Sequence, residues 1–106
     1  MGNPSRRKGD KFEREIAKIF EHHGMYAKRT PMSGAIAGWE GDVIVTIGDR
    51  KERIECKRRK AGFKTLYGWL GDNYILAIRD DQTEPLLVMR ANDLAQLLAA
   101  RDDGQS

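Results

Sequence analysis

Hydrophobic and polar residues alternate along the stretch from Gly41 to Lys60, around which the rest of the chain is organised. In its first half, apolar side chains recur with the two-residue period of a β-strand: Val43, Val45 and Ile47. Residues 48–51 have the composition of a turn. In the second half, charged side chains share one face of a returning strand: Arg53, Glu55 and Lys57. The pattern predicts a β-hairpin.

The turn of this hairpin sets its register. A two-residue turn at Asp49-Arg50 and a four-residue turn over 48–51 both place Asp42 opposite Lys57. Asp42 and Glu55 are then diagonal neighbours on one face, about 7–8 Å apart at Cα. Two carboxylates placed in this way, with an ammonium group beside them, can hold a divalent cation. They can equally form the solvated face of an ordinary hairpin.

An amphipathic helix is predicted before the hairpin. Asp10 is a candidate N-cap, and Gly24 is a signal for the end of the helix. The apolar stripe has the spacing i, i+4, i+7 and i+8: Phe12, Ile16, Ile19 and Phe20. Glu13 lies about 20° around the helix from Phe20. Its carboxylate can therefore reach past the edge of the core toward the sheet, or it can be an ordinary surface side chain.

The remaining elements follow from apolar runs separated by turn signals. We expect a short strand over 25–30, a loop of small residues over 31–38, a helix over 63–70, strands over 74–79 and 85–89, and a last helix over 93–100. The predicted inward-facing residues of the two helices are Phe63, Leu66, Tyr67 and Leu70, then Leu94, Leu97 and Leu98. The order α-β-β-β-α-β-β-α predicts an α/β/α layered fold with a central mixed sheet.

Length and composition indicate one domain over 106 residues, with a flexible basic arm at 1–8 and a polar tail at 101–106. No apolar run is long enough to span a membrane, and the N-terminus has no signal-peptide core. Cys56 is the single cysteine, which suits a reducing compartment, and its place on the apolar face favours a core residue over a nucleophile. We therefore expect an intracellular, cytoplasmic protein.

Charge is unevenly distributed along the chain. Residues 1–64 carry 16 Lys and Arg against 9 Asp and Glu, a net of +7, whereas residues 65–106 carry 3 against 7, a net of −4. A localised basic surface is typical of a protein that binds a polyanion, and it is also found on solvated surfaces with no such partner. Trp39 can cap the core or stack on a base.

Four segments resemble a known family when they are taken together. They are KGDKFERE (8–15), RTPMSG (29–34), GD (41–42) and IECK (54–57). In this order and spacing they resemble the PD-(D/E)XK nuclease superfamily, and within it the small archaeal-type Holliday-junction resolvases. The resemblance covers residues 8–60 well, and the rest of the chain only by the order of elements. Gly41 replaces the proline that the family usually has before the aspartate.

The resemblance implies a metal site built from a helix glutamate, a loop serine and the D…ExK core, which fall on Glu13, Ser33, Asp42, Glu55 and Lys57. The resemblance implies a Mg²⁺ ion, which Mn²⁺ can replace. Its ligands would be Asp42, Glu55, Glu13 and the backbone carbonyl of Cys56. Lys57 would orient the attacking water, and Ser33 would bind the scissile phosphate. The cations expected to contact DNA phosphates are Arg6, Arg7, Lys8, Arg29, Arg58, Arg59 and Lys60.

These observations predict a metal-dependent, structure-selective DNA endonuclease that resolves four-way junctions as a homodimer. We expect it to use no small-molecule cofactor and to bind no membrane. Two alternatives stay open: a nuclease of the same fold acting on nicks, flaps or duplex, and a non-catalytic nucleic-acid-binding module. The small size also suits a phage protein.

Overall fold

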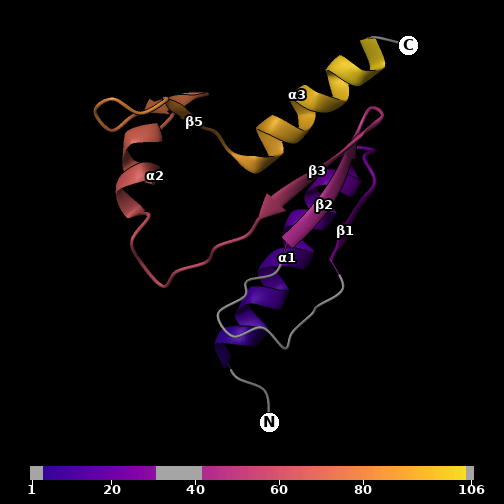
Figure 1. Ribbon diagram of the computed structural model, residues 1–106, viewed down its shortest axis with the longest axis horizontal. Helices are drawn as coiled ribbons and strands as arrows, with labels where there is room; N and C mark the ends of the chain where they lie inside the picture. Colours follow the sequence, from indigo (N-terminus) through magenta and orange to yellow (C-terminus); the bar gives the residue numbers. More distant parts are fainter. Residues whose placement is uncertain (1–3, 31–41, 105–106) are drawn as a thin grey trace.

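The computed structural model describes residues 4–30 and 42–104, with side chains for 11–30 and 42–101. Eight elements follow one another in the predicted order (Figure 1). Their bounds are α1 (Pro4–His22), β1 (Ala27–Arg29), β2 (Asp42–Ile47), β3 (Arg50–Glu55), α2 (Lys64–Leu70), β4 (Leu76–Ile78), β5 (Leu86–Val88) and α3 (Ala91–Gly104). Among the described residues, no helix has the length and hydropathy of a membrane span. The α/β class is confirmed.

The β2–β3 hairpin is present, but its register differs from the prediction. Asp42 pairs directly with Glu55, and Ile47 pairs with Arg50 across a two-residue turn. That turn is Gly48-Asp49, because Gly48 adopts a φ of 64°, which a glycine at the first central position of a II′ turn accepts without strain. The predicted pairing of Asp42 with Lys57 is wrong by two residues. A shift of two keeps every side chain on its face, so Asp42 and Glu55 still lie together.

Helix α1 begins at Pro4, earlier than the predicted start at Asp10. Proline is well tolerated in the first turn of a helix, and Gly9 in its interior costs only about 1 kcal/mol. Residues 4–8, predicted as a flexible arm, therefore belong to the helix. The end of α1 before Gly24 is confirmed, and Gly24 has a φ of 88°.

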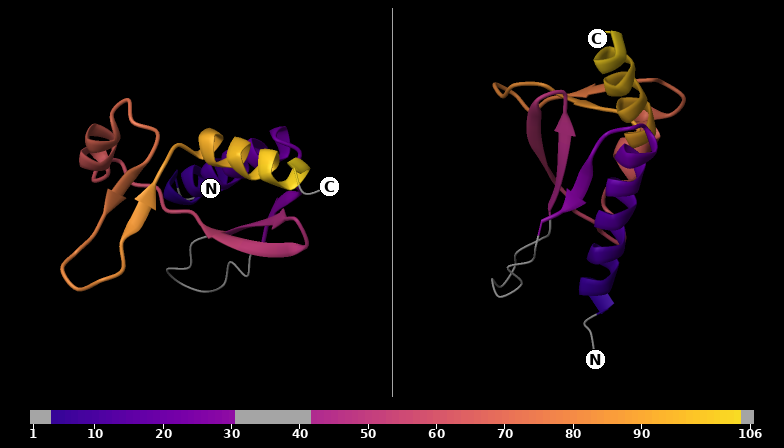
Figure 2. Two further views of the ribbon diagram at one scale, coloured as in Figure 1. Left: turned by 90° about the horizontal axis from the view of Figure 1, so that it is seen from above. Right: turned by 90° about the vertical axis from the view of Figure 1, so that its right-hand side faces the viewer.

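The hydrophobic core lies between α1, α3 and the β1–β2–β3 sheet. Its buried members are Ala17, Phe20, Met25, Ala27, Val43, Val45, Cys56 and Ala95. Both helices lie on one side of this sheet (Figure 2). On α3 the buried residue is Ala95, with Leu98 packed beside it, whereas Leu97 is half exposed and does not face inward as predicted.

The strands form two separate antiparallel sheets, β1–β2–β3 and β4–β5, rather than one central mixed sheet. The predicted α/β/α layering is also absent from the described residues, since the helices cover one face of the larger sheet (Figure 2). The edge strand β3 is rich in charged side chains, which is a device that discourages further strand pairing.

Residues 57–90 form an excursion that leaves the core after β3 and returns to it at α3 (Figure 1). It carries α2 and the β4–β5 hairpin, and Leu70 is its single buried residue. Tyr67 is exposed, contrary to its predicted place in a buried stripe, and the predicted buried strand 74–79 is a short β4 with exposed flanks. Arg90 donates to the carbonyls of Asn73 and Gly71, which fastens the end of α2 to the chain before α3.

Candidate active site

Asp42 is the first residue of β2, and its side chain is 2% exposed. Its cross-strand partner is Glu55, the last residue of β3. Directly opposed residues of an antiparallel pair lie on the same face, about 5 Å apart at Cα. The hairpin therefore brings two of the predicted site carboxylates together, and more closely than the predicted diagonal arrangement.

Arg53 completes this face of the hairpin. It lies two residues before Glu55, and its guanidinium donates through Nε and Nη2 to Oδ2 of Asp42. The Arg53 side chain is 63% exposed, so it closes a buried carboxylate from the solvent side. The alternation of residues in β3 predicts Arg53 on this face but no role for it, because a direct ion pair with Asp42 depends on the register of the hairpin.

Lys57 follows Glu55 by two residues and continues the same side of the chain beyond the end of β3. Its Nζ lies 3.8 Å from Oε1 of Glu55. Both side chains are largely exposed, in contrast to the buried Asp42. The edge of the hairpin thus presents a carboxylate and an ammonium group to solvent, with a second carboxylate behind them.

Glu13 comes from α1 and lies on the centre of its buried face, one turn before Ala17. Its Oε1 accepts a hydrogen bond of 2.9 Å from Nε of Arg29 on β1. A buried carboxylate is stable only when it is paired in this way. Arg29, which the sequence predicts to contact a DNA phosphate, therefore also forms an ion pair with Glu13 inside the protein.

Cys56 is buried between these groups, as predicted for a core residue. Burial, together with the nearby charges of Glu13 and Asp42, raises the pKa of its thiol from 9.0 to about 11. Both carboxylates are thus near enough to the thiol for their charges to act on it. A thiol with a raised pKa is a poor nucleophile at neutral pH, which agrees with a packing role.

The donor set fits a hard divalent cation only in part. Asp42 and Glu55 are opposed across the hairpin and offer carboxylate oxygens, the ligand type that Mg²⁺ prefers, although Arg53 and Lys57 already pair with them. The carboxylate of Glu13 is held by Arg29 and does not complete a set of three ligands with them. Among the side chains that the structure describes, no three acidic, His or Cys residues meet closely enough to hold a metal ion.

Ser33, Trp39 and Gly41 lie outside the described residues, as do the side chains of Arg6, Arg7 and Lys8. The backbone carbonyl of Cys56 stays a predicted ligand.

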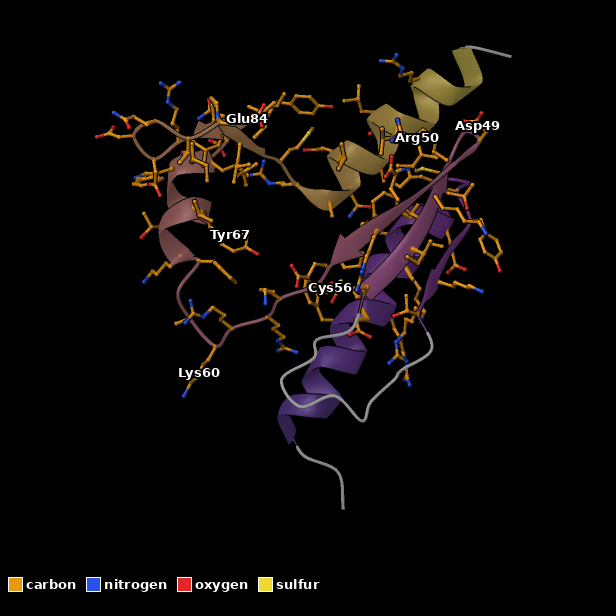
Figure 3. The ribbon with its side chains drawn as sticks, in the orientation of Figure 1. Asp49, Arg50, Cys56, Lys60, Tyr67 and Glu84 are labelled. Atoms are coloured by element: carbon orange, nitrogen blue, oxygen red, sulfur yellow. The ribbon has the colours of Figure 1, made fainter. Side chains whose placement is uncertain are left out.

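A basic segment follows the hairpin. Arg58, Arg59 and Lys60 are exposed, and they line a cleft of about 740 Å³ together with Lys57. Lys11 of α1 and Lys64 of α2 also line it. No sequence motif indicates these two lysines, since their approach to the segment depends on how the chain turns after residue 60. Figure 3 shows Lys60 on this segment between Cys56 and α2.

Comparison with known proteins gives a family match over nearly the whole chain. The family described as "Phage putative PDDEXK endonuclease" matches residues 4–101. No curated protein and no solved structure matches the chain. The match includes α1, the hairpin with Asp42, Glu55 and Lys57, and the excursion that follows. The chain therefore belongs to this phage PDDEXK endonuclease family, within the PD-(D/E)XK superfamily.

Proposed function

We propose that the protein is a metal-dependent, structure-selective DNA endonuclease that hydrolyses phosphodiester bonds in branched DNA, including four-way junctions. The observation that carries the proposal is the direct pairing of Asp42 with Glu55 beside Lys57. On an ordinary solvated hairpin face the carboxylates would be exposed, whereas the side chain of Asp42 is only 2% exposed. Membership of an endonuclease family supports the same conclusion.

In this proposal Asp42 and Glu55 hold Mg²⁺ or Mn²⁺, with the backbone carbonyl of Cys56 as a further ligand. When bound, the ion would lower the pKa of a coordinated water molecule and neutralise negative charge on the phosphate. Lys57 orients the attacking water and stabilises charge that develops at the phosphate. Ser33 binds the scissile phosphate. Glu13 supports the site from α1, where the hydrogen bond from Arg29 fixes the position of its carboxylate.

Arg53 adds a requirement to this scheme. Its guanidinium already neutralises Asp42, so a cation has to compete with it or share the carboxylate. Since the Arg53 side chain is 63% exposed, it can swing into solvent at little steric cost. We infer that Arg53 keeps the buried carboxylate paired while no cation is bound.

Preference for branched DNA is proposed from what surrounds the site. Arg58, Arg59 and Lys60 would contact phosphates, and such contacts position a protein on DNA without reading its sequence. Resolution of a four-way junction takes two cuts on opposed strands, so we propose a homodimer whose two-fold axis matches that of the junction. Trp69, exposed on α2, and the exposed β5 residues Leu86 and Leu87 are candidates for its interface, whereas Leu70 is buried within the chain.

The test is a cleavage assay on three labelled DNA substrates at equal concentration: a four-way junction, a flap and a linear duplex. We expect cleavage of the junction with Mg²⁺ or Mn²⁺, little with Ca²⁺ and none in EDTA. Ca²⁺ accepts looser coordination and should support binding without aligning the water. Undiminished cleavage in excess chelator would reject the metal mechanism. Equal rates on duplex and junction would reject the branched-DNA preference and leave a nuclease of broader specificity.

A further inference from the structure

The cleft beside Lys57 has two walls from distant parts of the chain. One wall is the first described turn of side chains on α1, and the other is the segment from Lys57 through the start of α2. Its volume of about 740 Å³ falls within the range of small-molecule and nucleotide sites. Lys57 belongs to both the cleft and the candidate active site, so a ligand in the cleft lies next to the reacting phosphate of the proposed function.

The charge of the cleft selects an anion. Six of its lining residues are cationic: Lys11, Lys57, Arg58, Arg59, Lys60 and Lys64. The lining includes one carboxylate, that of Glu15, and Lys57 is also paired with Glu55 beside the cleft. The cations outnumber the carboxylates at this cleft, and an excess of positive charge attracts an anionic ligand such as a chain of phosphates.

Aromatic side chains line the same cleft. Phe63 lies below the guanidinium of Arg59, whose Cζ is 5.9 Å from the centre of the ring. Tyr67 is one helical turn further along α2, and its amide donates to the carbonyl of Phe63 at 3.2 Å. The Tyr67 residue is 76% exposed although it lines the cleft, so its ring has an uncovered face. Figure 3 shows Tyr67 on the side of α2 that faces β3.

An exposed tyrosine among phosphate-binding cations has the composition of a single-strand binding site. Such sites combine a basic groove for the backbone with aromatic rings on which bases stack, and stacking requires a base face that is free. In a continuous duplex both faces of each base are covered by its neighbours. The cleft therefore fits a strand that has left the duplex.

Resting on the proposed function, we propose that this cleft binds one or two unpaired nucleotides next to the scissile phosphate. The cations hold the phosphates, and Tyr67 stacks on a base. The substrate class is then DNA in which a strand separates from its partner at the cut, as at a flap or an opened branch point.

Binding without divalent metal tests this, because cleavage is then not involved. The probe is a fluorescent oligothymidylate of about twelve nucleotides, within the site size of single-strand binders, followed by anisotropy in EDTA. We expect Tyr67→Ala to weaken binding at least about fivefold, which is the lower range for loss of one stacked base. Tyr67→Phe keeps the ring and should bind as the natural protein does. The matched control is Tyr26→Ala, which removes another largely exposed tyrosine, one that does not line the cleft.

A second probe separates base from backbone. An abasic oligonucleotide of the same length should bind the natural protein weakly, and Tyr67→Ala should not weaken it further. Equal affinity of Tyr67→Ala and the natural protein for oligothymidylate, with unchanged unfolding midpoints, would overturn the proposal. So would equal binding of the abasic strand. If Tyr67 is required for single-strand binding and no DNA is cut with Mg²⁺, the binding role of the cleft is supported and the proposed nuclease activity is rejected. The reverse result would retain the nuclease and reject the cleft.

Discussion

Each of the two buried carboxylates in the candidate site is paired with an arginine. Glu13 is 5% exposed and paired with Arg29, and Asp42 is 2% exposed and paired with Arg53. Removing one partner of such a pair leaves a buried charge without compensation, which is costly, whereas the net stabilisation by the intact pair is small. At the scale of residues, the arginines therefore matter most in the state without a cation.

Replacement of Arg53 by glutamine should expose this dependence. We expect Arg53→Gln to lower the free energy of unfolding in EDTA by about 1–3 kcal/mol, the cost of an unsatisfied buried group. Mg²⁺ should restore part of it, since a ligand that binds only the folded state stabilises that state. Urea unfolding followed by circular dichroism measures both effects. Arg50→Gln is the control, because Arg50 pairs with Glu52 on the surface. Equal losses in both variants would contradict the prediction.

The proposed catalytic residues give a second prediction. Asp42→Asn, Glu55→Gln and Lys57→Ala should each slow cleavage by about 100-fold or more, the usual effect of losing a group that stabilises transition-state charge. DNA affinity should be retained in Asp42→Asn and Glu55→Gln, since positioning depends on the basic segment. Glu52→Gln is a matched control from the opposite face of β3. Loss of folding in all three variants would instead indicate a structural role for these residues.

Cys56 provides a pH-dependent prediction. Its folded-state pKa of about 11 lies above the ordinary 9.0, so the folded state holds the thiol proton more tightly. The resulting stabilisation is complete below pH 9 and is lost as the pH rises to about 11. At pH 8 in EDTA, iodoacetamide should therefore alkylate the folded protein about 100-fold more slowly than the urea-unfolded chain, as two pKa units imply. Mass spectrometry of the adduct measures the rates, and equal rates would refute the raised pKa.

At the scale of elements, the β2–β3 hairpin depends on its turn. Gly48 has a φ of 64°, a left-handed conformation that costs an L-residue about 1–2 kcal/mol. Gly48→Ala should lower the free energy of unfolding by that amount. Gly68→Ala should have the opposite sign, stabilising by roughly 0.5–1 kcal/mol, because Gly68 lies within α2 with no atom close to an added Cβ. Urea unfolding of the two variants is the measurement, and an unchanged free energy of unfolding in Gly48→Ala would contradict the assignment of the turn.

The sequence predicted these elements unevenly, for physical reasons. The two-residue period fixed the faces of β2 and β3, so Asp42 and Glu55 were correctly placed together. The turn residues did not fix the register, because Asp49-Arg50 and Gly48-Asp49 are both acceptable two-residue turns, and the φ of Gly48 decides between them. Apolar periodicity also predicted burial of Tyr67, which the structure leaves exposed. Periodicity identifies an apolar face, and tertiary packing decides whether that face is covered.

At the scale of the whole molecule, the chain has more surface than a compact monomer. Its accessible area is 8655 Å², whereas a compact protein of 12.0 kDa exposes about 6,000 Å². Its radius of gyration is 15.5 Å, against about 13 Å for a compact domain of 100 residues. Leu86 and Leu87 are 63% and 67% exposed, and neighbours on a strand point to opposite faces, so both faces of the β4–β5 hairpin are uncovered. An isolated two-stranded hairpin is only marginally stable.

A second copy of the chain would cover this surface in the proposed homodimer. Light scattering should give twice the chain mass of 12.0 kDa at micromolar concentration. Replacement of both Leu86 and Leu87 by lysine should give a monomer, because like charges would then meet at the interface. Tyr26→Lys, an equally exposed apolar-to-lysine change on the other side of the core, should leave the dimer intact. A monomeric natural protein would reject the interface and the paired cuts that depend on it.

The excursion over residues 57–90 has a consequence for how such a protein can diverge. It is attached to the core at both ends, yet Leu70 is its only buried residue, so few of its positions are restrained by packing. Most substitutions there change the surface presented to DNA and leave the β2–β3 hairpin unchanged. Changes in the length of an exposed loop also carry only a small entropic cost. Descendants of this chain could therefore acquire new DNA targets through residues 58–90 while retaining the same chemistry at β2, β3 and Lys57.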